Sequence, residues 1–296
     1  MVSPGGPALS ERRGVTATDR LMLGYVALNT VIVVWRAGSV ASWPLMLLAN
    51  ALTVVLILLL PHAPATRLVV FLGGAYSLIL SVAYYTQLGV LATDVGHLHD
   101  QLVQRWEAAL FGGQVSVTWH ERAPSLALSW VMHLCYGSYY WLAALPPLFL
   151  FFRRSQAAFE RGAFVVTLAF YVCYTVFALF PVAGPRYFYG NATGPIAEVL
   201  PARIVHALLE GGSAYGTAFP SSHVAVSWCA VLSLWRDAPK LALGLAPVAL
   251  GLSLGAVYGQ FHYGVDALAG AALAVTLFGG CEALRAALGP RARQPR

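Results

Sequence analysis

Ala218-Phe-Pro-Ser-Ser-His-Val-Ala225 places a proline, two serines and a histidine where an apolar segment of membrane length begins. Tyr258-Gly-Gln-Phe-His-Tyr-Gly-Val-Asp266 places a second polar cluster at the start of another such segment. Ionisable groups are expensive to bury at membrane depth, so those found there are by default candidates for a functional site. Together the two segments predict helices that cross a membrane and carry a polar site at one boundary.

The spacing of these polar residues favours phosphoryl chemistry. His262 and Asp266 are four residues apart, so they share a face if a helix begins near position 262. A carboxylate one turn from an imidazole fixes its tautomer and raises its basicity, as a nucleophilic histidine requires. His223 follows Ser221 and Ser222 at an expected helix start. Two histidines, one aspartate and a helix N-terminus predict phosphoryl chemistry with no metal and no cofactor. Taken alone, each histidine could instead be a core residue with satisfied hydrogen bonds.

The composition indicates a polytopic membrane protein. Of the 296 residues, 58% are hydrophobic and 10% are charged, and the mean hydropathy is +0.68. The net charge of +6 does not indicate nucleic-acid binding, because the basic residues punctuate apolar runs instead of clustering on a polar face. The first twenty residues are charged and lack an apolar core, so no cleavable signal peptide is expected. The four cysteines show no paired spacing, so we expect them to pack as small apolar residues and not to form disulfides or bind zinc. They are Cys135, Cys173, Cys229 and Cys281.

Apolar segments recur along the chain, and spanning segments without the alternation of a barrel must be helices. We expect an all-α, polytopic membrane helical bundle with about eight transmembrane helices and an interfacial amphipathic helix. The expected spans are 21–37, 44–61, 67–91, 125–152, 160–181, 220–236, 241–258 and 264–288. The expected organisation begins with a polar N-terminal tail (1–20) and N-terminal transmembrane helices (21–91). An outer interfacial segment (92–124), a catalytic transmembrane core (125–288) and a basic C-terminal tail (289–296) follow.

The distribution of positive charge predicts that the N- and C-termini are cytoplasmic. In that orientation only five of the 18 Lys and Arg residues are outside, namely Arg36, Arg105, Arg122, Arg186 and Arg203. His223, His262 and Asp266 then lie at one boundary, which faces the extracytoplasmic side. The charge count therefore predicts a single site from both polar clusters, independently of any motif.

An amphipathic helix is expected in the outer segment 92–124. Its apolar residues recur at helical spacing: Leu98, Leu102, Trp106, Leu110 and Phe111. His97, His99 and Asp100 stand close together in the same segment. We interpret these three residues as a solvated helix face and expect no metal site.

Two more groups of polar residues lie near the outer boundary. His133, Tyr136 and Tyr140 share a helix face, where they either anchor the helix at the interface or line a headgroup cavity. Arg186 and Tyr187 follow a turn rich in Pro and Gly that ends the 160–181 span. The arginine either snorkels to the interface or binds a phosphate. Residues 191–219 are expected to cover the site as a short helix and a loop.

These residues resemble the signature motifs of a known family. Two stretches resemble the second and third motifs of the type 2 phosphatidic acid phosphatase superfamily: Pro220-Ser-Ser-His223 and His262-x-x-x-Asp266. Within that superfamily, three further stretches resemble the branch that contains inositol phosphorylceramide and sphingomyelin synthases. They are His133-x-x-Tyr136, Gly184-Pro-Arg-Tyr187 and Phe261-His-Tyr263. The resemblance extends from about residue 105, at Arg105-Trp-Glu-Ala-Ala-Leu-Phe-Gly112, to about residue 270.

The resemblance implies a role for each residue. His262 would attack phosphorus and form a phosphohistidine, and Asp266 would orient and polarise it. His223 would protonate the leaving oxygen and later activate the acceptor. The phosphate oxygens would be bound by the first N–H groups of the helix together with Ser221, Ser222 and Arg186. The substrate cavity would be lined by His133, Tyr136, Tyr140 and Tyr187.

Three positions depart from the phosphatases of the superfamily. Those enzymes carry an arginine six residues before the nucleophile and a lysine seven residues before the first-motif arginine, where this sequence has Ala256 and Leu179. Ser222 replaces the usual glycine. A site with fewer cations suits a singly charged phosphodiester better than a doubly charged monoester, which favours headgroup transfer or phosphodiester cleavage.

The expected function is therefore that of a membrane lipid phosphotransferase or phosphoesterase that acts on a phospholipid headgroup, with no nucleic-acid partner. A phosphatase for lipid phosphates or isoprenoid pyrophosphates would use the same residues with water as acceptor. A transporter is a more distant alternative, because no internal repeat relates the two halves of the chain and the polar residues gather at one boundary. The sequence does not specify the lipid donor, the acceptor or the oligomeric state.

Overall fold

The computed structural model describes residues 14–64, 66–93 and 98–288, and in these ranges the fold is all-α, as predicted. Three expected features lie outside the described residues: positions 1–13 of the polar tail, His97 and the basic tail 289–296. The one strand-like pairing in the described part of the chain is an isolated bridge between Val182 and Thr217. This bridge lies next to the candidate site described below.

Six helices among the described residues are long and apolar enough to cross a membrane. They are α1 (Ala17–Trp35), α2 (Trp43–Leu59), α3 (Arg67–Thr93), α9 (Gln156–Leu179), α14 (Pro239–Tyr258) and α15 (Gly264–Leu288), and a short 3-10 helix, η1 (Leu60–His62), extends α2. A further apolar helix, α13 (Ser222–Ser233), is shorter. These helices form the architecture of a polytopic helical membrane protein.

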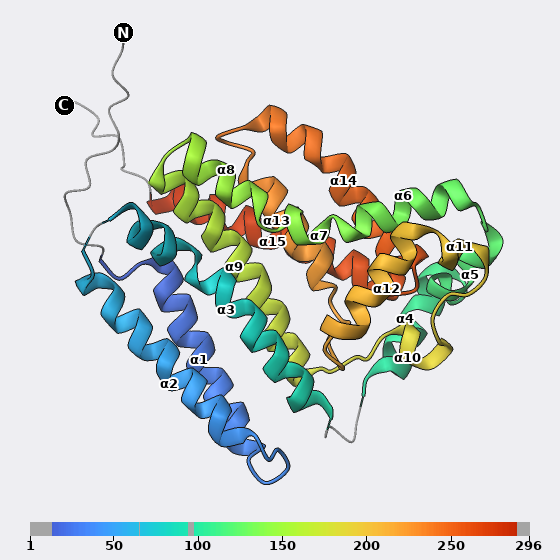
Figure 1. The fold of residues 1–296 in the computed structure, drawn as a ribbon, viewed down its shortest axis with the longest axis horizontal. Helices are drawn as coiled ribbons and strands as arrows, with labels where there is room; N and C mark the ends of the chain where they lie inside the picture. Colours follow the sequence, from blue (N-terminus) through green and yellow to red (C-terminus); the bar gives the residue numbers. More distant parts are fainter. Residues whose placement is uncertain (1–13, 65, 94–97, 289–296) are drawn as a thin grey trace.

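The segment 125–152, which we expected to form one span, is instead three consecutive helices. These are α6 (Leu126–Gly137), α7 (Tyr139–Leu142) and α8 (Leu145–Arg153), which follow one another in Figure 1. Pro146 and Pro147 stand in the first turn of α8, where proline is tolerated because it lacks an N–H. Before α7, the Ser138 hydroxyl donates to the Cys135 carbonyl at 2.5 Å, a local bond of the kind that bends helices.

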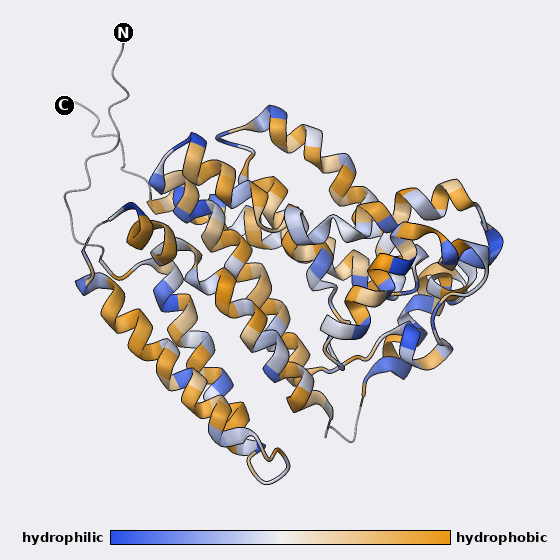
Figure 2. Cartoon of the chain, viewed as in Figure 1, coloured by the Kyte–Doolittle hydropathy of each residue, from blue (hydrophilic) through white to orange (hydrophobic). Residues whose placement is uncertain are grey.

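Five short helices gather at one end of the molecule (Figure 1). They are α4 (Asp100–Phe111), α5 (Val115–Arg122), α10 (Pro185–Tyr189), α11 (Pro195–Glu198) and α12 (Leu200–Gly212). The amphipathic helix expected in 92–124 is α4, and α5 follows it. Residues 191–219 contain two helices, α11 and α12, where one was expected. Figure 2 shows polar residues concentrated around this end, whereas α1, α2, α3 and α9 are mainly apolar.

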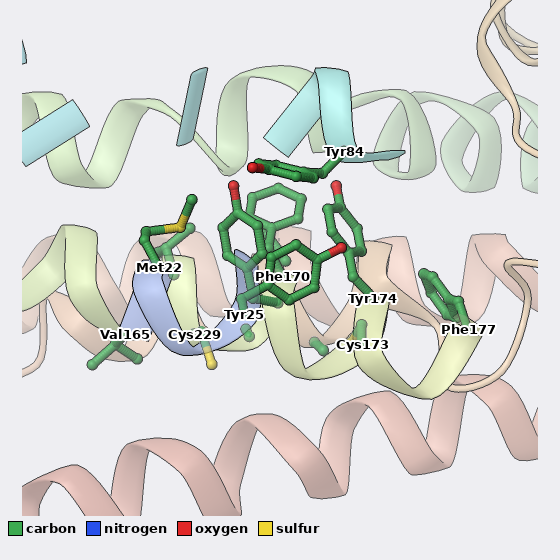
Figure 3. Close-up of a cluster of buried hydrophobic side chains, with 14 of the residues drawn as sticks. Met22, Tyr25, Tyr84, Val165, Phe170, Cys173, Tyr174, Phe177 and Cys229 are labelled. Atoms are coloured by element: carbon green, nitrogen blue, oxygen red, sulfur yellow. The ribbon is translucent and has the colours of Figure 1, made fainter. Parts of the chain in front are cut away.

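Helix α13 lies at the centre of the packing, in contact with α9, α14 and α15. A second core region joins α1 to α3 and α9 through aromatic side chains (Figure 3). Tyr25 of α1 meets Tyr84 of α3 edge-on, with ring centroids 5.1 Å apart, and Tyr171 of α9 at 4.5 Å. Edge-to-face pairs of this kind are worth about 0.5–1.5 kcal/mol beyond their buried area. The aromatic contacts therefore attach the N-terminal helices to the region that carries the site.

Buried polar side chains also join the N-terminal helices. Asn50 of α2 donates to the Asn29 side chain of α1 at 2.9 Å. Tyr76 of α3 donates to the Asp19 carboxylate, which also caps the start of α1, at 2.9 Å. Polar side chains between membrane helices are typically paired in this way, because lipid offers no alternative partner.

The helices define two opposite ends of the molecule. At one end, residues from the starts of α1 and α9 and from the end of α15 line a common crevice. At the other end, Ala183 after α9, Ala218 before α13 and Phe261 after α14 line a common cavity. Both sequence clusters lie at this second end, which is called the site end below.

Candidate active site

His262 lies in the turn between α14 and α15. Its backbone N–H donates to the Ala256 carbonyl at 3.0 Å, and α15 begins two residues later, at Gly264. The imidazole therefore precedes the helix instead of lying in its first turn. Asp266 does lie in the first turn of α15, where its carboxylate accepts the N–H of Tyr263 at 2.9 Å. The same carboxylate thus closes the turn that carries His262.

The tautomer of His262 follows from its neighbours. Nδ1–H donates to the Ala218 carbonyl oxygen at 3.0 Å, and a carboxylate oxygen of Asp266 lies 3.5 Å from the same nitrogen. Because both neighbours only accept hydrogen bonds, Nδ1 carries the proton and Nε2 keeps its lone pair. Burial first, and then the nearby His223 and Arg186, together lower the pKa of His262 to about 3. The ring is therefore neutral near pH 7, as a nucleophile must be.

His223 faces that lone pair. Its Nδ1 lies 3.4 Å from Nε2 of His262, so the two histidines predicted from separate segments are adjacent. His223 is the second residue of α13, and its ring stacks on Tyr136 with centroids 5.2 Å apart and meets Tyr139 at 4.3 Å. These rings hold the imidazole against His262.

Arg186 lies in the short helix α10, directly after a turn at Gly184. Gly184 has φ +102°, and a Cβ there would come within 3.2 Å of the Ala218 methyl group, so the turn requires glycine. The Arg186 guanidinium donates to Ser213 at 2.6 Å and to the Tyr187 hydroxyl at 2.8 Å. We call the space that these groups share the catalytic cavity, after the role proposed for it below; its lining includes Tyr136, Arg186, Tyr187, His223, Phe261 and His262.

Ser221 is the N-cap of α13, and Ser222 is the first residue of that helix. The Ser221 hydroxyl accepts the Val224 N–H at 3.4 Å as the N-cap, and the Ser221 N–H donates to the Asp266 carbonyl at 3.0 Å. Neither Ser221 nor Ser222 is among the residues that line the catalytic cavity. Ser221 therefore joins the start of α13 to the first turn of α15, which brings His223 and His262 to the same level.

A second cavity, of about 490 Å³, adjoins the catalytic cavity and shares Tyr85, Ser213 and His223 with it. We call it the apolar cavity, because its walls are mainly hydrophobic and aromatic, including Leu78, Val82, Tyr139, Tyr140, Phe170 and Tyr174. Val82 and Tyr140 are exposed on the outer surface of the helices. The apolar cavity therefore extends from His223 to the outer surface of the helices.

His133 is the one predicted lining residue that borders neither cavity. Its Nδ1–H donates to the Ser129 carbonyl at 2.8 Å. The Phe261 ring packs between it and the site, with centroids 5.8 Å from His133 and 4.5 Å from Tyr136. Tyr136, Tyr140 and Tyr187, by contrast, all line one of the two cavities.

The face of α4 that carries Asp100 and Glu107 is buried, so our interpretation of Asp100 as part of a solvated helix face was wrong. Asp100 and Glu107 are 1% and 0% exposed, whereas Leu102 on the opposite side is 38% exposed. The polar face is turned inward because the loops at the site end offer backbone N–H groups to its carboxylates. The signal that could have identified it is the spacing of Asp100, Gln104 and Glu107, which share one helical stripe. No group of three or more potential metal ligands occurs in the described residues.

The fold and this site define the class of the protein: an integral membrane helical bundle with two facing histidines at one end. The sequence model of the PAP2 superfamily matches residues 101–279, so the chain belongs to this superfamily. The match covers α5 to α14 and most of α4 and α15, and it leaves α1, α2 and α3 outside. Membership supports a lipid enzyme of the phosphatase or phosphotransferase type. No curated protein and no solved structure matches the chain.

Proposed function

We propose that this protein transfers a phosphoryl-containing headgroup of a phospholipid through a phosphohistidine on His262. The observation that carries the proposal is the pair of facing imidazoles, with His262 Nε2 3.4 Å from His223 Nδ1 and His262 Nδ1–H directed at the Ala218 carbonyl. One ring is held as a neutral nucleophile, and the other is placed to carry the proton that leaves or enters.

In the first step, Nε2 of His262 attacks phosphorus. The N–P bond forms as the bond from phosphorus to the lipid oxygen breaks. His223, which takes up a proton when the anionic phosphate lies beside it, gives that proton to the lipid oxygen. Asp266 and the Ala218 carbonyl stabilise the positive charge that develops on His262, since both lie near Nδ1. Arg186 stabilises the negative charge on the phosphorane oxygens.

In the second step, the acceptor attacks the phosphohistidine. His223 is now neutral and takes the proton of the acceptor hydroxyl, while the N–P bond breaks and His262 returns to its first state. An alcohol as acceptor yields a new phosphodiester, and water yields a phosphomonoester. Because the motifs resemble those of sphingomyelin and inositol phosphorylceramide synthases, a long-chain lipid alcohol is the acceptor to test beside water.

The apolar cavity supports a lipid as substrate. Its volume of about 490 Å³ lies within the range of ligand pockets in proteins, about 300–1,000 Å³, and its walls are mainly apolar. It meets the catalytic cavity at His223, so a chain lying in it would place its polar end beside the histidines.

The charge of the site favours a phosphodiester. Arg186 is the one Lys or Arg side chain among the described residues that line the catalytic cavity. Leu179 is exposed at the end of α9 and Ala256 is buried in the core, so neither position supplies the cation found in related phosphatases. One guanidinium matches the single negative charge of a phosphodiester better than the double charge of a monoester.

The experiment is incubation of the purified protein with defined phospholipids and mass spectrometry of the products. Wild-type protein is expected to release diacylglycerol and to transfer the headgroup to an added lipid alcohol. His262→Ala is expected to lower turnover by about 10⁴-fold or more, because the nucleophile is lost. His262→Ala protein that turns over normally would exclude the proposed intermediate.

The products also separate the alternatives. Release of inorganic phosphate from phosphatidic acid, with phosphodiester lipids left intact, would replace the transferase by a phosphatase that uses the same residues. Movement of a solute across a sealed membrane without any covalent product would indicate a transporter. The first outcome would also contradict the charge argument from Arg186, and the second would exclude the phosphohistidine.

A further inference from the structure

We propose that Asp100 and Glu107 of α4 are positioning residues that fix the distance between the Arg186 loop and the His262 turn. The proposal rests on the proposed function, since it assigns both carboxylates to the same site. Neither residue touches the catalytic cavity. They act through backbone N–H groups of the two loops.

Asp100 holds the loop that leads to Arg186. One of its carboxylate oxygens accepts the N–H of Ala183 at 2.9 Å, and the other accepts the N–H of Gly184 at 2.8 Å. Gly184 has the left-handed φ of +102° that turns the chain into α10. A single buried carboxylate therefore holds both peptide groups of the turn that aims Arg186.

The same loop reaches His262 by a short route. Val182, directly before the two peptide groups that Asp100 holds, accepts the N–H of Ala218 at 2.8 Å. The Ala218 carbonyl in turn accepts Nδ1–H of His262. A shift of the Asp100 loop would therefore move both Arg186 and the acceptor that fixes the His262 tautomer.

Glu107 holds the other loop. It is two turns along α4 from Asp100, on the same stripe, and one of its oxygens accepts the N–H of Gly264 at 2.6 Å. Its other oxygen accepts the N–H of Ser116 at the start of α5. Gly264 is two residues from His262, and a Cβ there would lie 2.8 Å from the Phe111 ring of α4. The turn that carries the nucleophile is thus packed directly on α4.

Tyr263, next to His262, connects the His262 turn to Asp100 and Gln104. Its hydroxyl donates to Asp100 at 3.2 Å and accepts from the Gln104 side chain at 2.9 Å. Asp100, Gln104 and Glu107 therefore contact residues on both sides of the site from a single helical stripe.

The cost of burying these acids argues for a geometric role. No Lys or Arg in the described part of the chain forms an ion pair with Asp100 or Glu107, and both side chains are almost wholly buried. A buried carboxylate without a cation is expensive unless several donors satisfy it. The donors here are backbone groups of the two catalytic loops, so the charge is stabilised only when both loops occupy these positions.

Amide hydrogen exchange of the protein in detergent micelles tests the contacts without reference to activity. Asp100→Asn leaves one acceptor oxygen for two N–H donors, so exchange at Ala183 and Gly184 is expected to rise by about tenfold or more. Glu107→Gln is expected to raise exchange at Gly264 and to leave Ala183 unchanged. Glu121→Gln, an exposed acid on α5, is the matched control and should change neither.

Steady-state kinetics then test the role in catalysis. Asp100→Asn is expected to raise KM and lower kcat, because both Arg186 and Ala218 follow its loop. Glu107→Gln is expected to lower kcat by about 10- to 100-fold with KM nearly constant, because only the nucleophile turn moves. If the two carboxylates had only a structural role, both variants would lose activity in proportion to the fraction of protein that fails to fold, with kcat and KM of the folded protein unchanged.

Unchanged exchange at Ala183, Gly184 and Gly264 in folded variants would overturn the proposal, and so would exchange that rises uniformly over the chain. If Asp100→Asn does not fold, Glu107→Gln decides by itself: exchange at Gly264 should rise while exchange at Ala183 stays constant, and no rise at Gly264 would overturn the proposal. If wild-type protein shows no lipid turnover, the proposed function fails while the exchange data still decide whether α4 holds the loops.

Discussion

At the scale of single residues, the His262 imidazole is held at Nδ1 by two acceptors of unequal distance. The Ala218 carbonyl at 3.0 Å is the closer, and the Asp266 carboxylate at 3.5 Å also closes the turn through the Tyr263 N–H. The carbonyl is enough to fix the tautomer. The carboxylate is the group that supplies negative charge when His262 becomes positive in the transition state.

This division of roles makes a prediction for Asp266→Asn. The amide oxygen can still accept the Tyr263 N–H, so the fold should persist, but the charge is lost. We expect turnover to fall by about 100- to 10⁴-fold, with an unchanged circular dichroism spectrum and little change in KM. Asp237→Asn is the control, because Asp237 pairs with Arg161 at the opposite end of the bundle. Near-normal turnover in Asp266→Asn would leave Asp266 with only a structural role.

The adjacency of His223 and His262 was predictable from the sequence, because each polar cluster starts an apolar segment and charge counting places both at one boundary. The residues that support them were not. Ala218 acts through its backbone carbonyl, which has no signature in the side-chain sequence. The displacement of His133 from the site by Phe261 depends on how α6 and α14 pack, which spacing within α6 does not determine.

At the scale of elements, α14 approaches α6 through glycines. Gly251 and Gly255 are four residues apart on one face of α14, and a Cβ at Gly251 would lie 2.6 Å from the Cys135 sulfur. A Cβ at Gly255 would come within 2.3 Å of the Met132 carbonyl oxygen. Small residues at this spacing allow membrane helices to pack at short distance. The contact places Phe261 and His262, just beyond the end of α14, beside Tyr136 of α6.

Gly255→Ala is therefore expected to push α14 away from α6. The methyl group would meet backbone, which cannot rotate away, so the variant should lose about 1–3 kcal/mol of stability, as overpacked cores do. Thermal unfolding in detergent measures this loss. Gly244→Ala is the control, because a Cβ there meets nothing within 4 Å, and alanine is the better helix former. Equal melting temperatures for the two variants would show that the glycine contact is not needed.

The sequence predicted least well the elements in which polar residues or prolines interrupt an apolar segment. A long apolar run such as 125–152 satisfies the length criterion for a span, yet Ser138 and the Pro146–Pro147 pair divide it into α6, α7 and α8. Helix α4 was predicted from its apolar stripe, but its orientation was not. Amphipathic periodicity shows that two faces exist; which face is buried depends on the donors of distant loops.

At the scale of the whole molecule, the helices place the site at one end and a set of ion pairs at the other. Arg161 pairs with Asp237 at 3.1 Å, and Arg236 pairs with Glu282 at 3.3 Å. These residues lie at the start of α9, after α13 and near the end of α15, away from the histidines. The clustering of basic residues at that end agrees with the charge asymmetry that predicts a cytoplasmic location for it.

Cysteine labelling tests this orientation. In a variant with all four native cysteines replaced by alanine, single cysteines are introduced at exposed positions of the two ends, by Asn191→Cys at the site end and Arg154→Cys at the opposite end. A maleimide that cannot cross membranes is added to intact cells, before and after permeabilisation. Because most Lys and Arg residues lie at the end that includes Arg154, that end should be cytoplasmic. We therefore expect Asn191→Cys to react in intact cells and Arg154→Cys to react only after permeabilisation. The reverse pattern would place the histidines on the cytoplasmic side, and the lipid substrate would then have to be drawn from the inner leaflet.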